Sequence, residues 1–326
     1  MLNTNALRDK YRAYAKAYSF RKEPFNLYEP VDYIMQLGGK NIRAVLTLSA
    51  FQLFDEKIDE ALPYAHAIEL FHNFSLVHDD IMDEATLRRG ELCVHKKFGI
   101  NAGILSGDIM LIFVFKMLSE IKDPSIRRKA NQAFTQAAID VCEGQQYDVD
   151  FETREAVSIE DYIIMISLKT AVLLAASLKI GALLAGAGDE NANLLYDFGW
   201  HAGVAFQIQD DLLDAYGDAV KVGKRKGGDI IQNKKTILYL EALERADSSD
   251  QSSLKKYFAE GHGLGDEEKV EKVLNIFDTY DIKQVVAKKR DEYREVAFAK
   301  LDLVDAKEMQ KEELRGIVDY IVSRES

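Results

Sequence analysis

Residues that cross-link or interrupt a chain are scarce in this sequence. Its 326 residues include two cysteines, Cys93 and Cys142, and no CxxC pair, so neither a disulfide framework nor a structural zinc site is expected. The four prolines all lie at or before Pro124, which leaves the rest of the chain without the residue that breaks helices. We therefore expect long helices, above all after Pro124.

Long apolar runs and an excess of positive charge are also missing. The longest purely apolar run covers residues 109–115, far short of the roughly 20 residues that span a bilayer. The first residues of the chain contain no continuous hydrophobic core, so no secretory signal is expected. Lys and Arg number 42 against 54 Asp and Glu, and the net charge of −12 has the wrong sign for neutralising nucleic-acid phosphates. The sequence predicts a soluble cytoplasmic protein with no nucleic-acid partner and no stable membrane insertion.

Apolar residues at helical spacing are what the sequence does have. Between residues 67 and 81 they recur every three or four positions, and the same holds between residues 195 and 216. Short runs rich in Val, Ile and Thr, which are typical of strands, are nearly absent. The pattern predicts an all-α fold, and because helical patterning resumes after each break we expect a single domain over residues 1–326. Further helices are expected at 102–118, 126–142, 158–187 and 267–299, and a mobile surface loop at 247–266.

Two motifs of the form DDxxD lie on the predicted helices. The first is DDIMD at residues 79–83, and the second is DDLLD at residues 210–214. Residues four apart share one face of a helix at about 6 Å, so the outer carboxylates of each motif repel each other unless a cation lies between them. Mg²⁺ accepts carboxylate oxygens while keeping positions for water and phosphate. One such motif would be typical of a solvated acidic surface, but two of them flanked by apolar residues favour a metal site.

Cationic residues near both motifs fit a diphosphate. Lys40 and Arg43 follow a glycine pair where a helix is expected to begin, and a helix N-terminus favours anions. Arg88 and Arg89 follow the first motif, and guanidinium groups suit bidentate phosphate binding. Lys169 interrupts a long apolar segment, where a lysine is costly unless it is paired. Lys224 and Lys234 follow the second motif in a basic stretch of the chain.

Taken in order, these motifs resemble those of the trans-isoprenyl diphosphate synthases in the polyprenyl synthetase family. The matching segments, within residues 38–236, are GGKNIR, HDDIMD, RRG, EGQQYD, KT, FQIQDDLLD, GKRKGGD and NKKT. The resemblance implies an all-α bundle, usually a homodimer, whose aspartate-rich helices face each other across a deep central cavity and bind three Mg²⁺ ions. The chain departs from the family at Asn41, where Arg is common, and at Ala44, where Pro is common. Because Lys40 and Arg43 are kept, we expect activity to survive.

The resemblance also implies a reaction and a role for each matching residue. Isopentenyl diphosphate condenses head to tail with an allylic diphosphate: cations stabilise the departing pyrophosphate, the double bond attacks the allylic carbocation, and pyrophosphate takes the proton while water is excluded. The implied metal ligands are Asp79, Asp83 and Asp210, supported by Asp80, Asp211 and Asp214; the allylic diphosphate would be held by Arg88, Lys169, Lys234 and Lys224, and isopentenyl diphosphate by Lys40, Arg43, His72 and Arg89. Gln207, Thr170 and Gln145 would line the reacting centre, where Lys169, Asp79 and Asp210 also act.

Residues before the first motif are expected to limit the length of the product. Phe71 lies eight positions before Asp79, a rise of about 12 Å along a helix, while Phe74 is five before it and Ser75 is small. An aromatic residue at the fifth position resembles short-chain geranylgeranyl diphosphate synthases. The sequence predicts a C20 product, with C15 next; the alternative is that both phenylalanines are ordinary core residues.

Three other classes share part of this pattern. An HD-type metal phosphohydrolase would explain His78 and Asp79, but it leaves the second motif and the basic residues without a role. A non-catalytic or partner-dependent subunit of a heteromeric polyprenyl synthase would keep the fold and lose aspartates, whereas both motifs are complete here. A terpene cyclase would share the metal chemistry but rarely needs Lys40, Arg43 and Arg89. Prenyl products that grow in five-carbon steps distinguish the synthase from all three.

Overall fold

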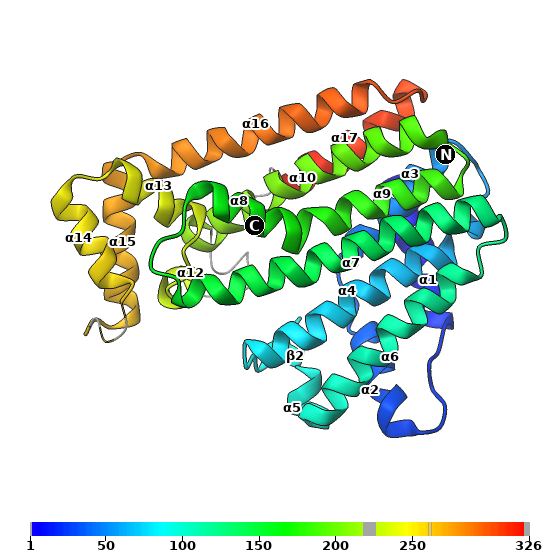
Figure 1. Cartoon of the computed structure of the whole chain (residues 1–326), viewed down its shortest axis with the longest axis horizontal. Coiled ribbons are helices and arrows are strands. Elements are labelled where there is room, and N and C mark those ends of the chain that lie inside the picture. Colours follow the sequence, from blue (N-terminus) through cyan, green and yellow to red (C-terminus); the bar gives the residue numbers. More distant parts are fainter. Residues whose placement is uncertain (1, 218–225, 260, 262, 323–326) are drawn as a thin grey trace. The chain divides into compact units, whose positions relative to one another are not determined.

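A computed structural model of the chain is dominated by helices, as the sequence predicts (Figure 1). It describes residues 2–217, 226–259, 261 and 263–322. The helices of the first half are α1 (Thr4–Ala17), α2 (Phe25–Gln36), α3 (Ile42–Gln52), the 3₁₀ turn η1 (Ile58–Glu60), α4 (Leu62–Met82), α5 (Val94–Phe98), α6 (Ile100–Ser119), α7 (Pro124–Thr153) and α8 (Ile159–Ile166). They are followed by the π turn η2 (Ser167–Ala171), α9 (Val172–Leu184), α10 (Gly188–Tyr216), α12 (Gly228–Ile231), α13 (Ile237–Arg245), α14 (Ser248–Tyr257), α15 (Asp266–Thr279), α16 (Ile282–Asp302) and α17 (Glu308–Val322).

Strand structure in the described residues is limited to one hairpin. The strands β1 (Leu87–Arg88) and β2 (Glu91–Leu92) pair antiparallel. The turn between them has positive φ at Arg89 (56°) and Gly90 (84°), which is the conformation that a tight two-residue hairpin needs. The segment after the first DDxxD motif is therefore a hairpin followed by α5, and the hairpin carries Arg88 and Arg89.

Some of the predicted boundaries are wrong. The expected loop at 247–266 contains α14, because the Asp247 side chain caps this helix by accepting from the backbone N–H groups of Ser249 and Asp250, both at 2.9 Å. The expected helix at 267–299 is two helices, with Asp281 between them in a left-handed conformation (φ 53°). The expected helix at 158–187 is interrupted by the π turn η2. Serine and aspartate thus serve here as helix starts, where their composition suggested a loop.

The chain divides into two compact units, each with its own buried residues. Unit 1 comprises Met1–Thr135, Ala176–Leu195 and Asp305–Leu314, and unit 2 comprises Gln136–Ala175, Tyr196–Val304 and Arg315–Ser326. The single domain expected over residues 1–326 stays a prediction. In unit 1, helices α1, α3 and α4 bury Leu7, Tyr11, Leu48, Phe51 and Ala65; in unit 2, helices α8, α10, α13, α15 and α16 bury Tyr162, Ile208, Leu240, Phe277 and Val286.

Helix α6 packs against α4 in unit 1 (Figure 1). Two glycines of α6 set how closely the two helices approach. A Cβ atom at Gly107 would lie 2.2 Å from Nε2 of His78, and one at Gly103 would lie 2.9 Å from Cδ1 of Ile81. His78 Nε2 also lies 3.2 Å from the carbonyl oxygen of Ile104. The glycines therefore let the α6 backbone pack directly against the end of α4 that carries the first DDxxD motif.

Two helical stretches are long and apolar enough to cross a membrane by length and composition alone. They are Ile100–Ser119, whose apolar window is 39% buried, and Ile159–Leu184, whose window is 67% buried. The longer one is mostly covered by the rest of the chain, as in the core of a soluble protein. The shorter one, α6, leaves most of its apolar window uncovered.

Candidate active site

The first DDxxD motif lies at the C-terminal end of α4. Asp83 is the C-cap residue, and its backbone N–H donates to the carbonyl oxygen of Asp79 at 2.8 Å. Carboxylates at this end of a helix face the negative end of the helix dipole, so a cation bound there is favoured. Asp80 is 1% exposed, and its Oδ2 atom has no hydrogen-bond partner among the described residues. The motif thus concentrates negative charge where a cation would relieve it.

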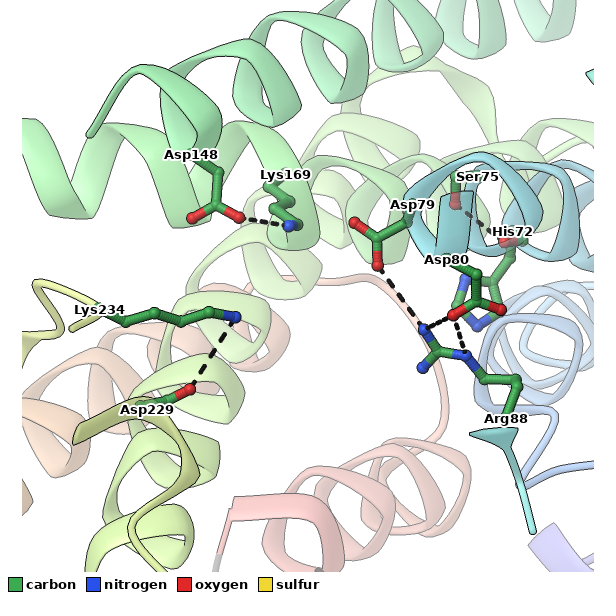
Figure 2. Close-up of polar contacts among 9 residues, drawn as sticks. All are labelled: His72, Ser75, Asp79, Asp80, Arg88, Asp148, Lys169, Asp229 and Lys234. Atoms are coloured by element: carbon green, nitrogen blue, oxygen red, sulfur yellow. Dashed lines mark hydrogen bonds and ion pairs between the residues drawn. The ribbon is translucent and has the colours of Figure 1, made fainter. Parts of the chain in front are cut away.

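Arg88 supplies one positive charge to this motif (Figure 2). Its Nη2 atom lies 2.5 Å from Oδ1 of Asp80 and 3.7 Å from Oδ2 of Asp79, and its Nε donates to the same Asp80 oxygen at 3.0 Å. Burial alone would lower the pKa of Arg88, but the hydrogen bond and charge of Asp80, followed by the charge of Asp79, raise it. The β1–β2 hairpin therefore presents a permanently charged guanidinium beside the carboxylates.

The glycine-lysine segment ends at the start of α3, as predicted. Lys40 directly precedes the N-cap residue Asn41, and Arg43 lies in the first helical turn. Burial lowers the pKa of Arg43 to about 10, against the opposing charge of Glu69. The Glu69 Oε1 atom accepts from the backbone N–H of Ala44 at 3.1 Å, so it satisfies one of the unpaired amides of the first turn. Glu69 thus anchors the start of α3 from within α4.

His72 on α4 lies among the predicted cations of unit 1. Burial lowers its pKa well below the usual range, and the charges of Arg43, Arg89 and Arg88 lower it further. The imidazole is therefore neutral near pH 7, and its N–H can donate to an anion while the arginines carry the charge. Arg89 is held beside it, since its Nη1 donates to Oδ1 of Asn73 at 3.2 Å.

Two arginines of α1 that the sequence did not single out brace the loop before α3. Arg8 Nε donates to the carbonyl oxygen of Lys40 at 3.1 Å, and Arg12 donates to the carbonyl oxygen of Gly39 at 2.8 Å and to Oδ1 of Asn41 at 3.3 Å. Gly39 and Asn41 both have positive φ, at 134° and 50°, a conformation that costs free energy at the asparagine. The only sequence signal was the spacing of four between the two arginines.

The second DDxxD motif lies in the last two turns of α10. Asp211 is 4% exposed and accepts from the hydroxyl of Tyr162 and from Nε2 of Gln207, the latter at 3.3 Å. Burial, and then the charge of Asp229, raise the pKa of Asp211 well above its usual range. Asp214 accepts from the backbone N–H of Asp229 at 2.9 Å and so caps α12. Tyr162 and Asp229 are site residues that sequence reasoning missed.

Lys169 and Thr170 lie in the π turn η2. Lys169 Nζ lies 2.6 Å from Oδ2 of Asp148 (Figure 2), and Thr170 Oγ1 donates to Oε1 of Gln207 at 3.2 Å. The lysine in this apolar segment is thus paired with a carboxylate. Single π turns inside α-helices are frequent at functional sites. This π turn contains Lys169 and Thr170, and it brings Thr170 within hydrogen-bond distance of Gln207.

Two glycines make room for the π turn. A Cβ atom at Gly144 of α7 would lie 2.2 Å from the backbone nitrogen of Lys169, and one at Gly203 of α10 would lie 2.6 Å from Cα of Ala171. Both contacts are with backbone or a Cα atom, which cannot yield as a flexible side chain can. Gln145, the next residue on α7, is half-buried.

The paired lysines after the second motif have different surroundings. Lys234 is exposed, and its Nζ lies 4.0 Å from Oδ1 of Asp229 (Figure 2). Lys235 instead donates to main-chain carbonyl oxygens at the C-terminal end of α7. Lys224, which was also expected to contact the allylic diphosphate, lies outside the described residues.

The predicted chain-length residues belong to an aromatic cluster in unit 1. The Phe71 ring is 1% exposed and packs 5.5 Å from Phe74 and 5.1 Å, edge-on, from Phe134 of α7, measured between ring centroids. Phe74 in turn lies 4.8 Å from the His78 ring. Ser75 donates from its Oγ to the carbonyl oxygen of His72 at 2.8 Å (Figure 2). Phe134 is an aromatic neighbour that the sequence did not indicate.

The carboxylate motifs fit Mg²⁺ only with help from other oxygens. Among the described residues, no group of three or more His, Cys, Asp or Glu side chains is arranged to hold a metal ion. Each motif nevertheless offers carboxylates, the hard ligands that Mg²⁺ takes while it keeps waters and substrate phosphates in its remaining positions. Oδ2 of Asp80 has no partner among the described residues, and burial and the charge of Asp229 raise the pKa of Asp211, so a bound cation would favour the ionised form of both carboxyl groups.

Comparisons with known proteins agree with this arrangement. The sequence profile described as Polyprenyl synthetase matches residues 24–277. A geranylgeranyl diphosphate synthase of Methanosarcina mazei is 36% identical over 305 residues, which cover 93% of this chain and 91% of that protein. A geranylfarnesyl diphosphate synthase of Natronomonas pharaonis is 37% identical over 242 residues, covering 69% and 71% of the two chains. A crystal structure of a geranylgeranyl pyrophosphate synthase matches with a TM-score of 0.95 at 39% identity and covers all of both chains.

The fold is therefore the all-α fold of the isoprenoid synthases. The chain belongs to the polyprenyl synthetase family, as the order of its motifs indicated. It is an enzyme of the prenyltransferase type.

Proposed function

We propose that this chain catalyses the Mg²⁺-dependent, head-to-tail condensation of isopentenyl diphosphate with an allylic diphosphate, and that its main product is geranylgeranyl diphosphate. Family membership and the names of its relatives support the reaction. The observation that carries the proposal is the repetition of one arrangement. In each unit a DDxxD motif at the end of a long helix has one buried aspartate, Asp80 or Asp211. Arg88 contacts the first motif, and Lys234 lies beside Asp229, whose backbone N–H donates to Asp214 of the second.

The proposed roles follow the positions that match the family. Mg²⁺, when bound, neutralises the diphosphate and stabilises the pyrophosphate that leaves. We propose that three ions bind per active site. The ligands would be Asp79, Asp80, Asp83, Asp210, Asp211 and Asp214; Arg88, Lys169, Lys224 and Lys234 would hold the allylic diphosphate, and Lys40, Arg43, His72 and Arg89 would hold isopentenyl diphosphate.

The chain's own groups would then steer the reaction. Arg43 and Arg89 carry fixed charge for the diphosphate of the nucleophile, and the neutral His72 donates a hydrogen bond without adding charge. The oxygen atoms of Thr170 and Gln207 provide dipoles beside the allylic carbon, where positive charge develops. We propose that the proton leaves with the released pyrophosphate, as the mechanism of the family implies.

A homodimer fits the uncovered face of α6. Ile104, Leu105, Ile112 and Phe115 are 37–60% exposed and follow one stripe of this helix. Asp108 lies exposed within the same stripe, and a carboxylate near the middle of a bilayer is costly, so a protein surface is the better partner. We propose that a second copy of the chain covers this stripe and that the enzyme works in the cytoplasm.

The test is product formation by the purified chain. It is incubated with Mg²⁺, labelled isopentenyl diphosphate and dimethylallyl, geranyl or farnesyl diphosphate, and the dephosphorylated products are sized. We expect prenyl alcohols that lengthen in five-carbon steps and disappear on chelation of the metal. Asp79→Ala should lower kcat by about 1,000-fold, while Asp9→Ala, at an exposed position of α1, should not change it. Activity that appears only with an added partner chain would instead support a subunit of a heteromeric synthase.

A further inference from the structure

Lys269 of α15 is a deeply buried lysine to which the proposed reaction gives no role. Its side chain is among the largest that are fully enclosed, at 1% exposure. Its Nζ donates to Oδ1 of Asn233 and lies 3.4 Å from the carbonyl oxygen of Ile231 and 5.1 Å from the centroid of the Phe258 ring. These two oxygens are neutral, and burying an ammonium group against neutral acceptors is costly. Burial lowers the pKa of Lys269, although the charge of Asp266 opposes this effect. We therefore ask which part of the backbone the Lys269 ammonium group holds in place.

Lys269 holds the segment that connects α12 to α13. Ile231 is the last residue of α12, so its carbonyl oxygen is one of those that a helix end leaves unpaired. Asn233 has a φ of 59°, in the left-handed region that costs free energy for a residue with a side chain. One ammonium group therefore caps the short helix and binds the strained asparagine.

Lys235 fixes the same segment from its other side. Its Nζ lies 2.7 Å from the carbonyl oxygen of Phe151 and 2.7 Å from that of Arg154, at the C-terminal end of α7, where cations interact favourably with the helix dipole. Lys234 stands between the two anchored residues. Its backbone N–H donates to the carbonyl oxygen of Asp229 at 2.9 Å, and its Nζ is 4.0 Å from Oδ1 of that residue.

We propose that Lys235 and Lys269 are positioning residues that hold the backbone at residues 233–235, so that the Lys234 ammonium meets the diphosphate of the allylic substrate. The inference rests on the proposed function and extends it to two lysines outside the predicted site. A lysine side chain is long and flexible, so its reach is set by where its backbone is fixed. A misplacement of about 1 Å in a substrate-binding group can cost about 100-fold in rate.

The first experiment compares Lys269→Met with Lys272→Met. Lys272 lies one turn further along α15, half-exposed and paired with Glu268 at 2.7 Å, so its variant removes the same charge without touching the segment. We expect Lys269→Met to raise the KM for the allylic diphosphate about tenfold and to leave the KM for isopentenyl diphosphate unchanged, while Lys272→Met matches the wild type. An equal rise in both KM values, or none, would overturn the inference.

A double-mutant cycle separates positioning from a purely structural role. If Lys269 acts through Lys234, the variant carrying both Lys234→Ala and Lys269→Met loses no more activity than Lys234→Ala alone. Multiplied losses would show that the two lysines act independently, against the inference. Should Lys269→Met not fold, Asn233→Gly removes the acceptor while keeping the left-handed backbone, and the same cycle is run with it.

A binding measurement keeps this inference distinct from the proposed function. If the wild type forms no prenyl product, the proposed function fails. Calorimetric titration with inorganic pyrophosphate and Mg²⁺ then tests the positioning role alone: we expect weaker binding by Lys269→Met than by Lys272→Met. Equal dissociation constants for the two variants would overturn the inference, whatever the outcome of the activity assay.

Discussion

Single residues in this protein acquire properties from burial that their sequence neighbours do not suggest. His66 of α4 is 0% exposed and lies among the rings of Tyr11, Tyr14, Tyr18 and Phe20. Its Nδ1 is 3.2 Å from the Tyr11 hydroxyl, and its Nε2 has no hydrogen-bond partner among the described residues. Burial lowers the pKa of His66 to about 4. The folded protein therefore keeps this imidazole neutral where an unfolded chain would protonate it.

This shift predicts a pH dependence of stability. The pKa of His66 is about 4 in the folded protein, against the ordinary histidine value of 6.5. Between these values the unfolded chain binds a proton that the folded chain does not, so the free energy of unfolding falls as pH falls from 6.5 towards 4. From pH 7 to pH 5 the loss from this group is about 2 kcal/mol. Urea unfolding of the wild type and His66→Phe at both pH values measures it: the wild type should lose about that much more. Parallel losses would contradict the assignment.

Phe74 carries a prediction about product length. It lies five residues before Asp79, about 7.5 Å along the helix, and packs between Phe71 and His78. Removing its ring should open space for a longer prenyl chain, so Phe74→Ala should shift the main product from C20 to C25 or longer. The products are sized by chromatography of the alcohols. Phe25→Ala, at a ring 48% exposed on α2, is the control, and an unchanged product in Phe74→Ala would make that residue ordinary core.

At the scale of elements, the π turn η2 is the feature that most affects the predicted site. The apolar pattern of residues 158–187 predicts one uninterrupted helix. Nothing in that pattern indicates that one turn is wider than the others. The widened turn lies against Gly144 of α7 and Gly203 of α10, where an added Cβ would meet the backbone nitrogen of Lys169 and Cα of Ala171. Packing between helices therefore decides how Lys169 and Thr170 are presented.

A methyl group at Gly144 should disturb this turn. Because the added Cβ would lie 2.2 Å from the backbone nitrogen of Lys169, Gly144→Ala must displace the turn, and we expect kcat to fall about 100-fold. Gly316→Ala is the matched control, since a Cβ at this exposed position of α17 has open space around it and should stabilise the helix by about 0.5–1 kcal/mol. Steady-state kinetics and thermal unfolding of both variants check the prediction. It is wrong if Gly144→Ala keeps wild-type kcat.

The largest feature of the molecule as a whole is the uncovered apolar face of α6. Its apolar window is 39% buried, against 67% for Ile159–Leu184, so the two apolar stretches of the chain have different surroundings. Exposed apolar stripes of this kind mark surfaces that bind another protein or a membrane. Because Asp108 lies exposed within the stripe, another protein chain is a better partner for this surface than a membrane.

A charge placed on this stripe should separate two copies of the chain. Leu105 is 56% exposed, so Leu105→Glu leaves the fold of one copy intact but buries a carboxylate in the proposed interface, which is costly. We expect a dimer mass for the wild type and a monomer mass for Leu105→Glu by light scattering after size exclusion. Leu303→Glu, at a leucine 67% exposed at the end of α16, should remain dimeric. A wild-type monomer, or a dimeric Leu105→Glu, would contradict the proposed interface.

Helical periodicity and the order of the motifs were enough to predict the all-α fold, both DDxxD motifs and the family. These depend on spacing within one helix, where residues three and four apart share a face whatever surrounds them. The same local reasoning failed at 247–266, because a serine-rich segment can serve as either a loop or a capped helix start. Composition alone cannot decide between those two.

How the candidate site residues are held depends on contacts between segments that lie far apart in the sequence. Tyr162 bonds Asp211, Arg12 braces the loop at Gly39, and Lys269 binds Asn233, each across at least 27 positions of the chain. Lys234 and Lys235 are adjacent in the sequence, yet Lys234 lies near Asp229 while Lys235 donates to a carbonyl oxygen at the end of α7. Their different contacts likewise depend on how the helices pack. Such contacts form when separate helices pack together, and no periodicity within a single helix encodes which side chains will then meet.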